Sequence, residues 1–228
     1  ARRQRQMCIR DRVIFEKGTT KIASNLFSGC TGIEQINIPE TVTEIKSYAF
    51  SGCTKLNTVS IPDSVTKIEF RAFGGCIGLS NVEIPDSVTE IESFAFAECS
   101  NLSMLVLSKN LETMGERAFG NCEKITQIEI PKSLDIGGAW NAGAFAGCTN
   151  LKKITFEKGT TKIANNLFSG CTGIEEINIP DTITEIKSYA FSGCTKLSSV
   201  NIPGSVSKIE YRAFNGCSVL KKISIFNE

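Results

Sequence analysis

Apolar and polar residues alternate in short stretches along the chain, and the same stretch recurs about every 23 residues. A well-formed unit runs from Leu197 to Cys217, with apolar residues at its first, fourth and sixth positions. Side chains of a β-strand point alternately to opposite faces. This spacing therefore predicts a short strand in which Val200 and Ile202 point inward and Asn201 points outward.

A proline follows the predicted strand in most units. All six prolines of the chain obey this register: Pro39, Pro62, Pro85, Pro131, Pro180 and Pro203. Because proline has no backbone N–H and cannot extend a strand ladder, we expect each strand to end there. A Val-x-x-Ile pair follows, as in Val42 and Ile45, and supplies two inward side chains on the opposite wall of the unit.

The motif Phe-x-x-Cys recurs nine times and fixes the period. It stands at Phe27/Cys30, Phe50/Cys53, Phe73/Cys76, Phe96/Cys99, Phe119/Cys122, Phe145/Cys148, Phe168/Cys171, Phe191/Cys194 and Phe214/Cys217. The spacing is 23 residues except between Phe119 and Phe145, where it is 26. Since these phenylalanines recur with the apolar pattern, we expect them in the core rather than on an aromatic binding platform. Replacing Phe119 by alanine should then cost about 3 to 5 kcal/mol.

A longer repeat contains the short one, because residues 15–76 recur almost verbatim at 156–217. Repeated units that cannot bury an apolar face alone do so by stacking, which pairs their strands into a parallel sheet. The sequence therefore predicts a repeat solenoid. We expect a right-handed coil with a parallel β-sheet on the concave wall and short strands, turns or 3-10 segments on the convex wall.

Seven of the nine repeat cysteines follow a glycine. Glycine adopts positive φ without steric cost, so a left-handed turn is predicted before each cysteine. Asn121 at the equivalent position fits this conformation, whereas Glu98 does not.

The consensus L-x-x-I-x-I-P-x-S-V-T-x-I-x-x-x-A-F-x-G-C resembles the BspA-like leucine-rich repeats over residues 13–228. In common with that family, it has cysteine where many other leucine-rich repeats have asparagine. The departures are local: Ser108 and Glu157 replace the proline, and Leu26 and Leu167 replace the alanine. The resemblance implies a cell-surface or secreted protein that adheres to host proteins or to other cells.

We expect a single leucine-rich-repeat solenoid of about nine units over residues 13–228, with a three-residue insertion within 132–144. The insertion holds the only tryptophan, Trp140, and is interpreted as a packed loop rather than a contact site. Residues 1–12 are basic and lack the period. We interpret them as a non-native or disordered lead segment, the alternative being a basic arm that binds polyanions. Both ends look cut, so the chain is interpreted as an uncapped fragment able to associate end to end.

Composition narrows the classes of function. The chain has 25 basic and 24 acidic residues, so no net charge attracts nucleic acid or an anionic membrane over long range. No apolar run approaches the roughly 20 residues that span a bilayer. Histidine is absent, which excludes Ser/His/Asp and Cys/His catalysis. We therefore expect no enzyme, no cofactor, no nucleic-acid partner and no membrane insertion.

The repeat cysteines are 23 or 26 residues apart, unlike the closely spaced pairs of zinc sites. Stacking brings successive thiols to about 5 Å, within reach of a disulfide by Cα distance. In parallel register, however, the Cβ atoms stay farther apart than the roughly 3.8 Å that a disulfide prefers. We interpret these residues as buried free thiols.

Outward residues between the inward strand positions are free to contact a ligand. They form two columns: Gln35, Thr58, Asn81, Met104, Gln127, Lys153, Glu176, Ser199 and Lys222, and Asn37, Ser60, Glu83, Val106, Glu129, Thr155, Asn178, Asn201 and Ser224. Met104 and Val106 make an apolar spot with a polar surround of Asn81, Glu83, Gln127 and Glu129, which is the predicted protein-binding site. The expected partner is an extracellular-matrix or host-cell surface protein. The alternatives are a structural spacer that presents another domain and an enzyme.

Overall fold

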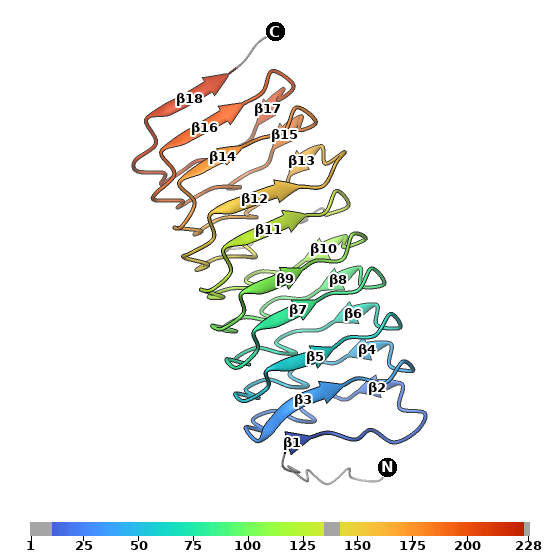
Figure 1. Ribbon diagram of the computed structural model, residues 1–228. Helices are drawn as coiled ribbons and strands as arrows, with labels where there is room; N and C mark the ends of the chain where they lie inside the picture. Colours follow the sequence, from blue (N-terminus) through green and yellow to red (C-terminus); the bar gives the residue numbers. More distant parts are fainter. Residues whose placement is uncertain (1–10, 135–141, 226–228) are drawn as a thin grey trace.

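A computed structural model describes residues 11–134 and 142–225, and it is a parallel β-solenoid of stacked coils (Figure 1). Every regular element in these ranges is a strand, and none is a helix. A typical coil starts with a strand on one wall, turns after the proline, forms a shorter strand on the opposite wall, and returns through the Ala-Phe turn. This is the repeat solenoid that the 23-residue pattern predicts.

The longer strands line one wall, which we call the strand face. They are β1 (Asp11–Arg12), β3 (Ile33–Asn37), β5 (Thr58–Ser60), β7 (Asn81–Glu83), β9 (Met104–Val106), β11 (Gln127–Ile130), β12 (Lys153–Phe156), β14 (Glu176–Asn178), β16 (Ser199–Ile202) and β18 (Lys222–Ile225). They pair in parallel as four successive sheets, β1-β3-β5, β7-β9, β11-β12 and β14-β16-β18, and the pairs join equivalent positions of neighbouring units, as for Glu83 with Val106. Equivalent side chains therefore form columns along the solenoid.

Two-residue strands form the opposite wall, which we call the back wall. They are β2 (Lys21–Ile22), β4 (Glu44–Ile45), β6 (Lys67–Ile68), β8 (Glu90–Ile91), β10 (Thr113–Met114), β13 (Lys162–Ile163), β15 (Glu185–Ile186) and β17 (Lys208–Ile209). One parallel sheet joins β2 to β10 and a second joins β13 to β17. The 26-residue unit lies between the two sheets. The predicted inward isoleucines are buried on this wall, as at Ile45 and Ile91.

Between the walls, the phenylalanines of the Phe-x-x-Cys motif form one continuous stack. The ring centroids of successive phenylalanines lie 5.0 to 6.2 Å apart from Phe27 to Phe214, and each successive pair is stacked. The seven rings from Phe50 to Phe191 are fully buried, which confirms the predicted core position. Phe145 stacks on Phe119 at 5.5 Å, so the insertion leaves the column unbroken.

Left-handed residues recur at two positions in the Ala-Phe turn. The glycines before the cysteines have positive φ, as predicted, and so does Asn121. Glu98 also adopts φ 64°, against the expectation from its side chain. A second column of left-handed residues was not predicted: Asn25, Tyr48, Arg71, Phe94, Arg117, Asn166, Tyr189 and Arg212. Backbone N–H groups in this turn donate to carbonyls of the next coil, as from Phe50 to Ala72, so stacking holds a conformation that these side chains disfavour locally.

Three predictions concern segments at the edges of the described ranges. Asp11 and Arg12, from the predicted lead segment, pair with β3 as strand β1. Residues 1–10 lie outside the described residues, and the boundary at residue 13 stays a prediction. Residues 135–141 also lie outside them, with Trp140, so the interpretation of the insertion as a packed loop stays a prediction too.

Candidate protein-binding site on the strand face

The strand face presents the outward columns as predicted. From β3 to β14, their residues are exposed, and Ser199 and Asn201 in β16 are half-buried. Most of these side chains are polar or charged. Met104 and Val106 are the exception, with 58% and 49% of their surface exposed, while Leu105 between them is buried at 8%. The apolar spot expected from the sequence is therefore open to solvent in the middle of the solenoid.

Two hollows flank Val106 on the strand face. The larger, of about 900 Å³, lies over β5, β7 and β9; its outward walls include Ser60, Asn81, Glu83 and Met104. The smaller, of about 180 Å³, lies over β9 and β11; its lining includes Glu129 and, beyond the ends of β11 and β12, Pro131 and Glu157. Both hollows share Val106, Leu107 and Lys109. Five of the six predicted site residues thus line or adjoin one continuous surface, with Gln127 beside them on β11.

The carboxylates of this surface differ in their partners. At the rim, an Asp86 Oδ1 accepts the Lys109 backbone N–H at 2.8 Å, and Glu157 pairs with Lys132 at 3.7 Å. Glu83 and Glu129 project from the strands themselves. Within residues 11–134 and 142–225, neither carboxylate has an ion pair. Two carboxylates without an ion pair in the described part of the chain therefore stand on either side of Val106.

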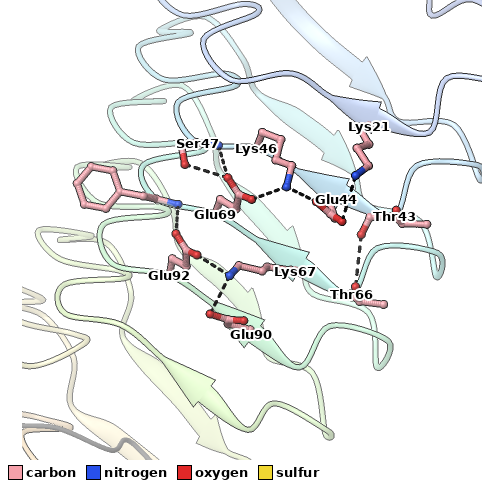
Figure 2. A network of polar contacts seen from close by, with 11 residues as sticks. Lys21, Thr43, Glu44, Lys46, Ser47, Thr66, Lys67, Glu69, Glu90 and Glu92 are labelled. Carbon is pink, nitrogen blue, oxygen red and sulfur yellow. Dashed lines mark hydrogen bonds and ion pairs between the residues drawn. The ribbon is translucent and has the colours of Figure 1, made fainter.

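The back wall is organised differently, because many of its lysines and glutamates pair with each other. Lys46 contacts Glu44 of its own coil and, at 2.8 Å, Glu69 of the next coil (Figure 2). Lys67 likewise contacts Glu90 at 3.0 Å and Glu92 at 2.6 Å. This ladder was not predicted, although opposite charges one period apart at Lys21, Glu44, Lys67 and Glu90 were a visible signal in the sequence.

Hydrogen bonds tie this ladder to the backbone. Glu69 accepts the backbone N–H and hydroxyl of Ser47, both at 2.9 Å, and Glu92 accepts the backbone N–H of Phe70 at 2.8 Å (Figure 2). Burial alone would raise the pKa of Glu69, but its bonds to Lys46 and Ser47 lower it overall. The hydrogen bond from Lys46 likewise lowers the pKa of Glu44. These lysines and glutamates therefore form a cross-coil polar network in which their charges are paired with each other.

The cysteines form an inner ladder. All nine from Cys30 to Cys217 are without disulfides, and all but Cys217 are buried. Successive thiols donate to the phenylalanine carbonyl of the preceding coil, as from Cys99 to Phe73 at 3.3 Å. Burial raises the pKa of Cys99 and of Cys148 to about 12, so these groups stay protonated donors. No group of three or more metal-binding side chains lies together within the described part of the chain.

Comparison with known proteins identifies the repeat. A family model described as "BspA type Leucine rich repeat region" matches residues 20–140 and 139–228, with 6 copies. Among curated proteins, none matches the chain significantly. Residues 11–134 and 142–225 form no helix, and so none that could cross a membrane.

Solved bacterial structures share the fold. A leucine-rich repeat protein from Bacteroides ovatus is 28% identical, with a TM-score of 0.67 over 98% of this chain and 65% of its own. A leucine-rich cell surface protein from Faecalibacterium prausnitzii is 32% identical, with a TM-score of 0.54 over 90% and 63%. The pneumococcal vaccine antigen PcpA is 26% identical, with a TM-score of 0.65 over 90% and 56%. The chain thus spans less than two thirds of each of these proteins.

Proposed function

Because this chain belongs to the BspA-type leucine-rich-repeat family, we propose that it is a cell-surface or secreted module that binds protein. It adheres to a protein of a host or of another cell through the strand face, and it catalyses no reaction. The site comprises Asn81, Glu83, Met104, Val106, Gln127 and Glu129. The cell-surface description of the Faecalibacterium prausnitzii protein supports this location.

The observation that carries the proposal is the exposure of Met104 and Val106 in the middle of an otherwise polar face. A surface built from stacked, hydrogen-bonded coils offers many contacts while losing little conformational entropy on binding. An apolar centre with a polar rim is the usual arrangement of a protein interface. The back wall lacks this character, because its charged side chains are engaged with each other.

Charge reversal at Glu83 and Glu129 tests the proposal. The double variant Glu83→Lys, Glu129→Lys is compared with wild type in pull-downs from purified extracellular-matrix and cell-surface proteins. We expect a captured protein to lose at least about tenfold in affinity, since each reversal opposes a complementary charge at the interface. Glu34→Lys, Glu176→Lys is the control with the same change in net charge, on β3 and β14.

Equal affinity of wild type and the Glu83/Glu129 variant would instead favour a spacer role, in which the strand face binds nothing. In that case, Met104→Ser, Val106→Ser should also leave capture unchanged. Circular dichroism checks that every variant retains the solenoid.

Self-association is a second expected interaction of the isolated chain. The last coils expose Ile209, Tyr211, Val219 and Ile223 by 42% to 63%. Exposed apolar surface of this kind favours stacking against another coil, so two copies can associate end to end. Light scattering should then give a molecular mass that rises with concentration, and Ile209→Lys should keep the chain monomeric.

A further inference from the structure

We infer that the strand face selects a partner segment in which two cationic side chains flank one apolar side chain. This inference rests on the proposed protein-binding function and names the chemistry of its partner. The apolar side chain contacts Met104 and Val106, and one cationic side chain enters each of the two hollows beside Val106. The segment lies along the solenoid axis, across β7, β9 and β11.

Two strand carboxylates give this surface its preference for cations. Glu83 lines the larger hollow and Glu129 the smaller one, and Val106 forms part of both. Each carboxylate is exposed and has no ion pair in the described part of the chain. A cation from a partner would therefore gain a new ion pair without displacing an existing one. A partner carboxylate at the same positions would meet like charge, which disfavours binding.

The hollows also suit the stems of long cationic side chains. Leu105 and Leu107 form the floor of the smaller hollow and are almost fully buried, with Pro131 beside them. Lysine and arginine bury their methylene stems along such apolar surface while the charged end stays near water. The carboxylate of Glu129 then lies at the wall of the hollow that receives the stem.

The spacing matches an extended segment. Glu83 pairs in register with Val106, so the two residues lie about 4.8 Å apart along one outward column. Glu129 holds the equivalent position on β11, which lies beside β9 but belongs to a separate sheet in the described part of the chain. In an extended chain, residues i, i+2 and i+4 point to one side at intervals of about 6.6 Å. Flexible lysine side chains cover the small difference on either side of a central apolar residue. The sequence Lys-Thr-Leu-Thr-Lys therefore fits the site.

Lys109 lines both hollows and carries the same charge as the incoming side chains. Its backbone N–H is held by Asp86, but the ammonium group weakens the attraction for a cation. Removing that charge should strengthen binding to a basic segment and weaken binding to an acidic one.

Methionine methyl NMR provides a direct test. The chain has three methionines, of which Met104 is exposed in the site and Met114 is buried on the back wall. The ¹³C-methyl-methionine-labelled chain is titrated with four peptides, which carry lysine or glutamate flanks around a central leucine or serine. A Met104→Leu variant assigns the signal. We expect Lys-Thr-Leu-Thr-Lys to shift the Met104 signal, leave the Met114 signal unchanged, and bind at least about tenfold tighter than the other three.

The protein variants complete the test. In the double variant Glu83→Gln, Glu129→Gln, the affinity for the lysine-flanked peptide should fall to that for the glutamate-flanked one. In Lys109→Gln, the affinity for the lysine-flanked peptide should rise by about threefold. Equal binding of lysine- and glutamate-flanked peptides would overturn the charge rule and leave the protein-binding role of the face standing. Absence of any Met104 shift would overturn the inference itself, while the pull-down independently decides the proposed function.

Discussion

Two coils of nearly identical sequence have different environments in this solenoid. The unit SVTKIEFRAFGGC at residues 64–76 recurs as SVSKIEYRAFNGC at 205–217. In the first copy, Ile68 and Phe73 are fully buried. In the second, the equivalent Ile209 is 45% exposed, and Phe214 is only partly buried. The same amino acids therefore receive different burial at the two places.

The difference lies in what covers each coil. Strand β6 pairs with β4 on one side and β8 on the other, whereas β17 pairs with β15 alone among the described strands (Figure 1). The core of each coil is completed by the coils stacked against it, so stability in a solenoid is a nearest-neighbour property. The polar ladder is less affected by position, because Lys187, Lys208 and Ser188 engage Glu210 in the second copy as well.

Alanine replacement of the stacked phenylalanines should show the largest difference in stability between the two copies. Phe73→Ala removes a ring stacked on both Phe50 and Phe96, and we expect a loss of about 3 to 5 kcal/mol in the free energy of unfolding. Phe214→Ala removes a ring stacked on Phe191, and the loss should be about half as large. Urea unfolding followed by circular dichroism measures both. Equal losses would contradict the nearest-neighbour account.

The back-wall isoleucines should show the same contrast on a smaller scale. Ile68→Ala creates a cavity between covered coils and should cost about 2 to 4 kcal/mol. At Ile209, much of the side chain is already in water, so Ile209→Ala should cost less than about 1 kcal/mol. Urea titrations of the two variants measure these losses. Equal losses in the free energy of unfolding would mean that local sequence alone sets the cost.

Acid should affect both copies through their glutamates. Contacts with Lys208, Ser188 and Lys187 lower the pKa of Glu210 to about 2, and the pKa of Glu69 is lowered as well. Since the folded pKa lies below the unfolded value, the stabilisation is present above about pH 4.5 and is lost as the pH falls towards 2. The urea midpoint should fall over this range. In Glu69→Gln, Glu210→Gln, the fall should be shallower, and an identical fall would argue against the ladder as its source.

The reactivity of the repeat cysteines should also differ between the two copies. Contact with Cys53 and burial raise the pKa of Cys76, which is enclosed, whereas Cys217 is half-buried at the equivalent position. In a Cys8→Ser background, a thiol reagent should modify Cys217 at least about tenfold faster than Cys76 under native conditions. Mass spectrometry of digests taken at successive times measures which cysteine is modified first. Modification of Cys76 first would show that the inner ladder opens more readily than the end.

Sequence periodicity was enough to predict the architecture. The alternation around Val200 and Ile202, the proline after each strand and the Phe-x-x-Cys register predicted the two walls and the core. These features are local, because a side chain's direction in a strand follows from its parity. The exposed apolar spot at Met104 and Val106 followed from the same parity.

The tertiary structure alone decided how the coils act on each other. It revealed the Lys–Glu ladder, the thiol bonds to phenylalanine carbonyls and the left-handed conformation of Glu98. It also showed the two hollows beside Val106 and the exposure of Ile209. Each depends on atoms from residues one period apart, whose relative position is set by stacking. The sequence thus determined what each coil contains, and the packing of coils determined which of those groups are buried, paired or left open to a partner.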